Sequence, residues 1–227
     1  MLGGGIVACE LAQFLQRMGT KVTQIQRSPR ILKEMSPEAS AVIEEAFRDG
    51  GLEVITDTQL TRIERIDNGF TAHFTKDGKE QSVTAKHVCN ALGRRPNVDG
   101  LNLKKLDYEN RTGVVFTDPQ IATAGRTLEE CSEAGYEVVA ADYPFNDHGK
   151  SMLMEANYGY VKAWADKKTG LLLGAECLGK DAGELIHSMA VAVSLNADIE
   201  SLVRVHWYHP TLSEIWAYPL EYILDEL

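Results

Sequence analysis

Hydrophobic residues in the first quarter of the chain recur with the spacing of amphipathic helices, and short apolar runs separate them. Five of them share one face of a helix predicted over 7–18: Val7, Leu11, Phe14, Leu15 and Met18. Gly19 ends that helix, and 21–26 predicts a short strand. A serine cap followed by a proline begins a second predicted helix over 36–49, and 52–55 predicts the next strand. This alternation is typical of an α/β domain with a parallel sheet.

The pattern changes to alternation at every second residue between 59 and 88. Asn68-Gly69 and Asp77-Gly78 interrupt it, and both dipeptides favour tight hairpin turns, so this part predicts an antiparallel meander. A buried strand is expected over 88–92, and the polar, turn-rich stretch 99–113 is interpreted as a junction.

The second half has the pattern of an α+β domain. Thr127 and Glu130 have capping-box spacing and predict a short helix that ends near Gly135. Three strands are expected after it: 138–144, 158–164 and 171–178. Asp181 is expected to cap a long apolar helix, and 211–224 predicts the final helix. The chain is therefore expected to hold two domains, 1–112 and 113–227.

Composition and charge narrow the class of protein. The 227 residues are 44% hydrophobic and 25% charged, which leaves enough apolar material for real cores. A net charge of -10 gives no broad attraction to nucleic acid or to an anionic membrane, and no apolar run or signal peptide indicates a membrane protein. The four cysteines have neither metal-like nor redox-like spacing and predict a cytoplasmic protein with reduced thiols: Cys9, Cys89, Cys131 and Cys177.

A glycine-rich loop leads directly into the first predicted helix. Gly3, Gly5 and Ala8 fit the G-x-G-x-x-G/A pattern, which allows a tight turn, close approach of a pyrophosphate and close helix packing. The helix N-terminus then offers free N–H groups to phosphates. The alternative is a glycine turn between strand and helix that binds nothing. The α/β alternation that follows favours dinucleotide binding.

The end of the next strand bears on the choice of cofactor. A carboxylate there would accept hydrogen bonds from the adenosine ribose and favour NAD(H). Gln26 occupies that place, and Arg27 and Arg30 follow it. Loss of the carboxylate together with two nearby cations favours the 2′-phosphate of NADP(H). The alternative is that both arginines are ordinary surface charges.

A candidate acid/base pair lies near the end of the chain. Pro210 fits the first position of the final predicted helix, so His209 should lie just before that helix and Glu214 in its first turn. A carboxylate bound to one ring nitrogen fixes the tautomer and stabilises the imidazolium, as a general acid/base requires. Alternatively, Glu214 only caps the helix or interacts with its dipole.

Four segments in this order resemble the pyridine nucleotide-disulfide oxidoreductases, the flavoenzymes that include dihydrolipoamide dehydrogenase and mercuric reductase: 3–12, 91–97, 115–122 and 209–214. The resemblance covers nearly the entire chain. It implies a Rossmann-like NAD(P)-binding domain, with Glu10 and Gly93 added to its site, followed by an α+β dimerisation domain. It also implies FAD, a redox-active disulfide, and a homodimer in which His209, supported by Glu214, serves the partner subunit's site.

Departures from the family pattern limit what the resemblance implies. No Cys-x4-Cys pair is present. The chain begins at the second glycine fingerprint, and the later flavin segment, expected between Asn97 and Val114, is missing. The chain is therefore predicted to be a truncated member that binds no FAD and has no substantial reductase activity alone, with a slight lean towards dihydrolipoamide dehydrogenase. The alternative is a non-catalytic dimeric module for nucleotide binding or assembly.

Three smaller features complete the expectations. Only Met1-Leu2 remains of the strand before the glycine loop, and losing about four buried aliphatic side chains at roughly 1.5–3 kcal/mol each predicts a marginal first half. His206 is interpreted as structural or exposed. The final helix has more apolar residues than one core-facing stripe can hold, which favours a dimer surface. The alternative is that all of them belong to the core: Ile215, Trp216, Tyr218, Leu220, Tyr222, Ile223 and Leu224.

Overall fold

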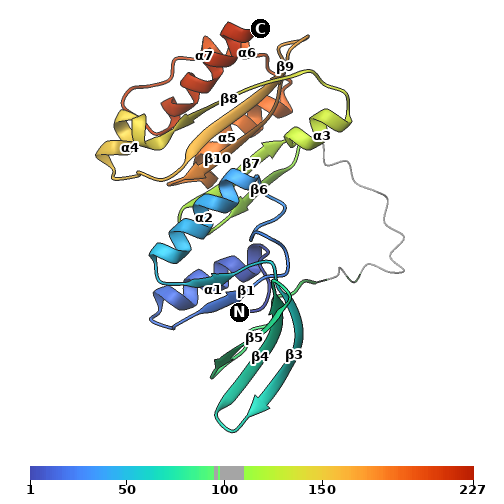
Figure 1. Cartoon of the computed structure of the whole chain (residues 1–227). Coiled ribbons are helices and arrows are strands. Elements are labelled where there is room, and N and C mark those ends of the chain that lie inside the picture. Colours follow the sequence, from blue (N-terminus) through green and yellow to red (C-terminus); the bar gives the residue numbers. More distant parts are fainter. Residues whose placement is uncertain (95–96, 98–109) are drawn as a thin grey trace. The chain divides into compact units, whose positions relative to one another are not determined.

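A computed structural model describes residues 1–94, 97 and 110–227 of the chain. These residues form two compact units, Met1–Leu103 and Lys104–Leu227, and each is described by itself (Figure 1). Most of the junction expected over 99–113 lies outside the described residues, as do Arg95 and Pro96 of the second family motif.

The parallel part of the first unit is small. It contains α1 (Ile6–Arg17), β1 (Thr23–Ile25), α2 (Pro37–Asp49) and β2 (Glu53–Ile55). The strands β1 and β2 pair in parallel, and Leu2 forms single parallel bridges to Ile25 and Asn90. The α/β prediction is confirmed. The strand expected over 88–92 is wrong, because only the Asn90 bridge forms and Leu92 is exposed.

The second helix begins and ends where its sequence signals predict. Ser36 accepts the N–H of Ala39 at 3.1 Å, Pro37 opens the helix, and Gly50 follows its last residue. These caps act through bonds local to the helix ends, which is why the sequence alone located them.

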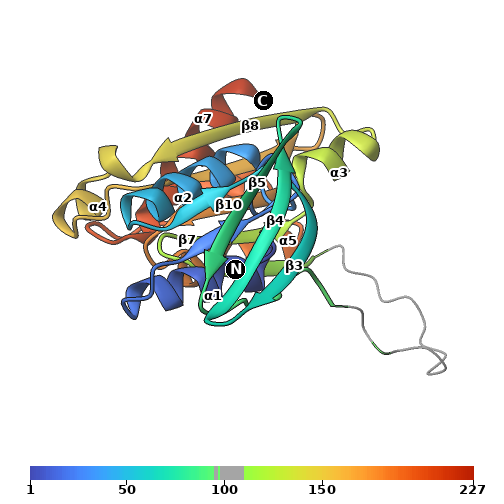
Figure 2. The ribbon, with the colours of Figure 1, turned by 60° about the horizontal axis from the view of Figure 1, so that its bottom comes forward.

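The rest of the first unit is the predicted antiparallel meander. It contains β3 (Gln59–Ile66), β4 (Gly69–Lys76) and β5 (Lys79–Ala85), in that order across the sheet (Figure 2). Asp77 and Gly78 both have positive φ, as a tight hairpin turn requires. One face of the meander contributes Ala72 and Phe74 to a small core with Leu2 and Ile25.

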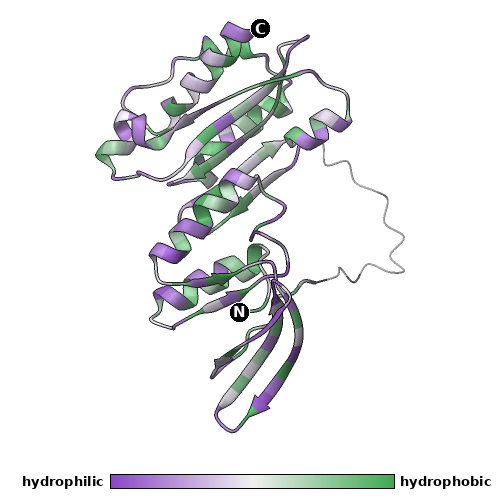
Figure 3. Ribbon diagram, viewed as in Figure 1, coloured by the Kyte–Doolittle hydropathy of each residue, from purple (hydrophilic) through white to green (hydrophobic). Residues whose placement is uncertain are grey.

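The apolar face predicted for α1 does not pack as expected. Of its residues, Phe14 is 58% exposed and Met18 71%, and Val7 and Leu11 are exposed as well. The buried face consists of smaller side chains: Ala8, Cys9, Ala12 and Gln13. Small residues allow the helix to approach the sheet closely, so the periodic large residues point away from it. Figure 3 shows apolar residues along α1 and along the helices of the second unit.

The second unit is built on a five-stranded antiparallel sheet with the order β6-β7-β10-β9-β8. The strands are β6 (Thr112–Val115), β7 (Gln120–Gly125), β8 (Val138–Pro144), β9 (Tyr160–Asp166) and β10 (Leu172–Gly179). The three predicted strands in this half match β8, β9 and β10 within two residues. The α+β prediction for the second half is thereby confirmed.

Short helices connect these strands and cover the sheet. They are α3 (Leu128–Glu133), the 3₁₀ helix η1 (Phe145–Asp147), α4 (Gly149–Leu153), α5 (Ala182–Ser194), α6 (Ile199–Val203), the 3₁₀ helix η2 (Ser213–Trp216) and α7 (Ala217–Glu226). Thr127 and Glu130 form the predicted capping box of α3. In contrast, the side chain of Asp181 makes no cap bond to α5, because this residue adopts a left-handed conformation.

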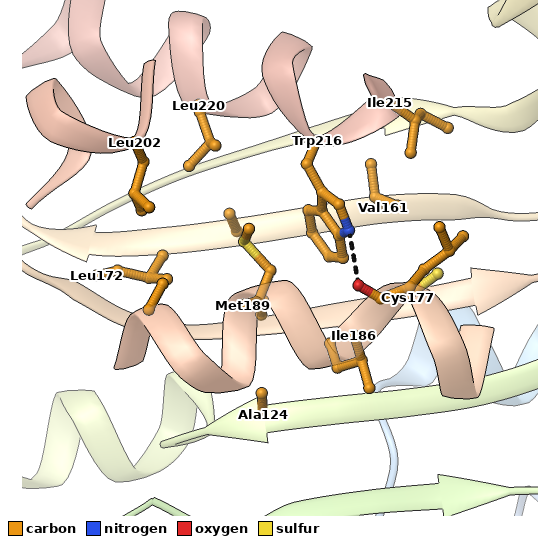
Figure 4. Close-up of a cluster of buried hydrophobic side chains, with 14 of the residues drawn as sticks. Ala124, Val161, Leu172, Cys177, Ile186, Met189, Leu202, Ile215, Trp216 and Leu220 are labelled. Carbon is orange, nitrogen blue, oxygen red and sulfur yellow. Dashed lines mark hydrogen bonds between the residues drawn. The ribbon is translucent and has the colours of Figure 1, made fainter. Parts of the chain in front are cut away.

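The main core lies between one face of the sheet and the helices α5, α6 and α7. Trp216 is fully buried there and donates its indole N–H to the Leu185 carbonyl at 3.1 Å (Figure 4). On the opposite face, Cys131 of α3 packs with Trp164 and Leu173. No helix within the described part of the chain is long and apolar enough to cross a membrane.

The apolar residues of the final predicted helix pack mainly in the core. Ile215, Trp216, Leu220 and Ile223 are fully buried, whereas Tyr222 is 49% exposed. For these four residues the dimer-surface interpretation is wrong and the core alternative holds.

Candidate functional site

The glycine loop of the first unit has the geometry that close approach of a ligand requires. Gly3 has φ +112°, and a Cβ on it would lie 2.4 Å from the Ala91 carbonyl oxygen, so only glycine fits there. A Cβ on Gly5, in contrast, would meet no atom within 4 Å. Gly5 directly precedes α1, whose first N–H groups have no partners within the helix. The space over Gly5 thus suits a phosphate.

Hydrogen bonds from neighbouring segments hold this loop in place. Gln24 donates its side-chain N–H to the Gly3 carbonyl at 3.0 Å, and the Leu32 N–H donates to the Gly4 carbonyl at 2.6 Å. Cys9 lies beneath the loop, and burial raises the pKa of its thiol to about 12. The loop is therefore shaped by contacts that need no bound ligand.

A cavity of about 660 Å³ opens beside the loop. Its volume is within the usual range for small-molecule sites. Of the predicted cofactor residues, it is lined by Gly3, Gly5, Gln26, Arg27 and Gly93. The sequence analysis missed several other lining residues, which come from the segment after β1 and from the meander: Leu32, Lys33, Met35 and Leu60.

The remaining predicted cofactor residues do not line the cavity. Ala8 is fully buried, in keeping with the close helix packing expected of it, and Glu10 lies further along α1. Arg30 donates to the carbonyl oxygens of Lys33 at 2.8 Å and Met35 at 3.2 Å. Its guanidinium therefore shapes the 30–35 loop, and Lys33 is the second cation at the cavity beside Arg27.

The acid/base pair predicted in the second unit forms a direct contact. Nδ1 of His209 lies 2.9 Å from Oε2 and 3.1 Å from Oε1 of Glu214. The His209 side chain is 79% exposed, whereas that of Glu214 is 9% exposed. With Nδ1 bound to the carboxylate, Nε2 is the ring nitrogen left to exchange a proton with a substrate.

The local structure around this pair differs from the expectation. Pro210 does not open a helix: η2 begins at Ser213, and the His209–Pro210 peptide bond is cis. The Glu214 N–H donates to Thr211 Oγ at 3.3 Å. The signal that could have located this start is the spacing of Thr211 and Glu214, which matches that of a capping box. His206 is exposed, in agreement with its interpretation.

A second histidine, which the sequence analysis did not identify, reaches the same carboxylate. Nε2 of His148 lies 3.3 Å from Oε1 of Glu214, and Nδ1 of His148 lies 2.7 Å from Ser151 Oγ. His148 precedes α4 and is 66 residues from Glu214 in the chain. No local pattern in the sequence signals a contact over that distance.

The four cysteines are all free. Burial raises the pKa of the Cys177 thiol, and burial does the same for Cys131. Within the described ranges, no group of three His, Cys, Asp or Glu side chains could hold a metal ion.

Comparison with known proteins identifies the family. The family model "pyridine nucleotide-disulphide oxidoreductase" matches residues 1–127, and that of the family's dimerisation domain matches residues 112–219. The chain therefore belongs to the pyridine nucleotide-disulphide oxidoreductases, a family of FAD- and NAD(P)-dependent enzymes.

Its relatives include named enzymes. The chain is 27% identical to dihydrolipoyl dehydrogenase of Rhizobium etli, over 94% of this chain and 57% of that protein. It is 26% identical to mercuric reductase of Staphylococcus aureus, over 94% of this chain and 50% of that protein. The chain thus spans 50–57% of the length of these relatives.

Solved structures show the same fold. LpdA of Mycobacterium tuberculosis superposes with a TM-score of 0.86 at 18% identity, covering 98% of this chain and 60% of that one. The flavoprotein disulfide reductase RclA of Escherichia coli superposes with a TM-score of 0.83 at 19% identity, covering 97% and 63%.

The alignments also reveal an internal difference in length. The match to the Rhizobium etli enzyme extends over 273 positions, whereas this chain has 227 residues, so at least 46 of those positions are occupied only in the relative.

Proposed function

We propose that this chain supplies the nicotinamide-nucleotide domain (1–112) and the dimerisation domain (113–227) of an FAD-dependent disulfide oxidoreductase of the dihydrolipoamide dehydrogenase type. The observation that carries the proposal is the 2.9 Å contact between His209 and Glu214, a buried carboxylate that orients an exposed imidazole. The parent reaction is NAD(P)-linked oxidation or reduction of a dithiol/disulfide through FAD.

The residues of the first unit fit a nicotinamide dinucleotide. Gly5 leaves open space in front of α1, where a pyrophosphate can accept hydrogen bonds from the helix N-terminus. Arg27 lines the cavity and favours the 2′-phosphate of NADP(H) over NAD(H), and Lys33 lines it as an ion pair with Glu34, 3.2 Å away. Bound there, the cofactor supplies the hydride of the parent reaction.

The residues of this chain do not fit the other two redox groups of the family, the FAD and the redox-active disulfide. The four cysteines are free and none is spaced as the family's disulfide pair. The aligned Rhizobium etli enzyme occupies at least 46 positions that this chain does not, and we place the family's later flavin-binding segment among them. We therefore propose that the chain alone binds no FAD and is inactive as a reductase.

The second unit can perform one part of the chemistry. Nε2 of His209 can take a proton from a thiol, because Glu214 holds Nδ1–H and stabilises the resulting imidazolium. In a homodimer this exposed ring can serve the site of the other subunit. Exposed apolar side chains support such a dimer, notably Val191 on α5, Leu195 directly after it and Leu153 on α4. The reduced thiols support a cytoplasmic location.

The second candidate function is a non-catalytic dimeric module that binds nucleotide or only assembles. The absence of a cysteine pair in the sequence favours it for this chain in isolation. The two candidates agree on the dimer and differ in whether a flavin-containing partner restores redox chemistry.

Three measurements on the purified full-length chain test these proposals. Visible absorption should show no flavin, sizing should give a dimer, and calorimetry should show NADPH binding. The variant Gly5→Ala should retain the wild-type unfolding transition, because its Cβ meets no atom, but should lose NADPH binding at least about tenfold. A yellow protein, a monomer, or equal NADPH binding by Gly5→Ala would each contradict one part of the proposal.

A further inference from the structure

Glu214 lies between two histidines that come from different parts of the second unit. His209 contacts it from the segment before η2, and His148 contacts it from the start of α4. We propose that His148 is a positioning residue for the His209–Glu214 pair: by donating a hydrogen bond to Oε1, it leaves Oε2 directed at Nδ1 of His209. This inference rests on the proposed acid/base role of His209.

The contacts of His148 select one tautomer of its ring. A favourable contact with the Glu214 carboxylate requires a proton on Nε2. With Nε2 protonated in a neutral ring, Nδ1 is an acceptor, and the Ser151 hydroxyl can donate to it over the 2.7 Å separation. The result is a directed chain of donors from Ser151 through His148 to Glu214, which ends at the ring of His209.

Packing holds the His148 ring in this orientation. The side chain is 1% exposed, and its backbone N–H donates to the Phe145 carbonyl at 3.2 Å. The edge of the ring meets Tyr218 at a centroid distance of 6.1 Å, and Tyr218 stacks on Tyr143 at 4.0 Å. The ring is thus fixed on several sides, so it can act as a rigid support for the carboxylate.

Glu214 needs such a support because it is buried. A buried carboxylate has to replace the hydrogen bonds that water would give it. Without His148, Oε1 would depend on Nδ1 of His209, which lies 3.1 Å away and also contacts Oε2. The exposed His209 ring can rotate away from both oxygens. The donor from His148 holds the carboxylate whether or not His209 is in place, so the acceptor for Nδ1–H is preorganised.

Two substitutions of His148 separate the effect of its N–H donor from the effect of its side-chain volume. His148→Gln retains an N–H near the position of Nε2, whereas His148→Leu fills similar space without a donor. His206→Leu is the matched control, because His206 is an exposed histidine of the same unit. All variants are made in the full-length chain, and folding is checked by backbone amide spectra.

The readout is the protonation pattern of the His209 ring, measured by proton–nitrogen correlation spectra of ¹⁵N-histidine-labelled protein and assigned with His209→Gln. The wild type, His148→Gln and His206→Leu should show Nδ1 protonated. His148→Leu should show a mixture of tautomers, with at least about a threefold loss of the Nδ1–H signal. Identical His209 patterns in folded His148→Gln and His148→Leu overturn the proposal, because packing alone would then explain the contact.

If His148→Leu fails to fold, Ser151→Ala decides the matter. Removing the donor to Nδ1 should give mixed tautomers of His148 and a changed His209 signal, and unchanged signals of both rings overturn the proposal. Addition of dithiothreitol to the wild type tests the acid/base role separately. A His209 signal that does not respond to the dithiol counts against the proposed function, even where the tautomer result supports the role of His148.

Discussion

The two units differ in how completely they bury their own apolar surface. In the second unit, five strands and three helices enclose one core that contains Trp216, Ile186 and Met189. In the first unit, the regular parallel strands β1 and β2 have three residues each, and the large side chains of α1 remain exposed. The glycine loop keeps its form nevertheless, because it depends on a few hydrogen bonds from the Gln24 side chain and from nearby backbone. The loop can therefore keep its form in a unit whose parallel sheet is small.

The largest expected contrast is between Trp216 and Phe14. Trp216→Ala should lower the free energy of unfolding by about 3–5 kcal/mol, because it leaves a large cavity and removes the indole hydrogen bond to the Leu185 carbonyl. Phe14→Ala should change it by less than about 0.5 kcal/mol, since Phe14 is 58% exposed. Urea unfolding followed by circular dichroism measures both, and equal losses would remove the contrast between the units.

The second expectation concerns local opening. Amides of β1 and β2 should exchange with deuterium at least about 100-fold faster than those of β9 and β10, equivalent to about 2.7 kcal/mol. The reason is that β1 and β2 pair over only three residues each, with a single bridge from Leu2 beside them. Hydrogen exchange of the full-length chain, read by mass spectrometry, provides the comparison. Equal protection in both sheets would show that the first unit is not marginal.

The third prediction distinguishes three cations of the first unit. Arg27→Ala and Lys33→Ala should each weaken NADPH binding about tenfold and leave NADH binding unchanged, because both line the cavity. Arg30→Ala should instead destabilise the 30–35 loop by about 1 kcal/mol through loss of its bonds to two carbonyls. Calorimetry with both nucleotides is the measurement. Equal NADPH and NADH affinities, unchanged by Arg27→Ala, would end the NADP(H) preference.

The smallest expected effect is in thiol reactivity. Half-buried Cys89 should react first with Ellman's reagent at pH 8, followed by Cys9 as the first unit opens, and Cys131 and Cys177 last. Burial raises the pKa of Cys9 to about 12, so at pH 8 only about one part in ten thousand is thiolate. Reaction of the closed form at pH 8 should therefore be negligible, so the rate of Cys9 modification reports the opening of the first unit. Simultaneous reaction of Cys9 and Cys177 would contradict unequal opening.

Local signals predicted the parts of the fold that depend on neighbours in the sequence. The cap at Ser36, the capping box at Thr127 and the hairpin turn at Asp77 were all located correctly, because each forms within a few residues. The contact of His209 with Glu214 is also local, because the two residues are five positions apart in the sequence. The start of the helix that contains Glu214 was predicted too early, because proline also occurs just before a helix.

Predictions that required knowing what lies opposite a side chain were less successful. The periodicity of α1 indicated an amphipathic helix and could not show that the small face would pack inward. Nor could the spacing of Arg27 and Arg30 reveal that the carbonyls of Lys33 and Met35 bind the second guanidinium.

The sequence by itself determined the family, the order of many of the elements, the glycine loop and the His209–Glu214 pair, since these are written in contiguous motifs, whereas β6 and β7 were not predicted. Only the tertiary structure decided which face of α1 is buried, which cations line the cavity and that His148 reaches Glu214. These depend on contacts between residues far apart in the chain, and the free energy of such contacts is set by burial and geometry that no local pattern records.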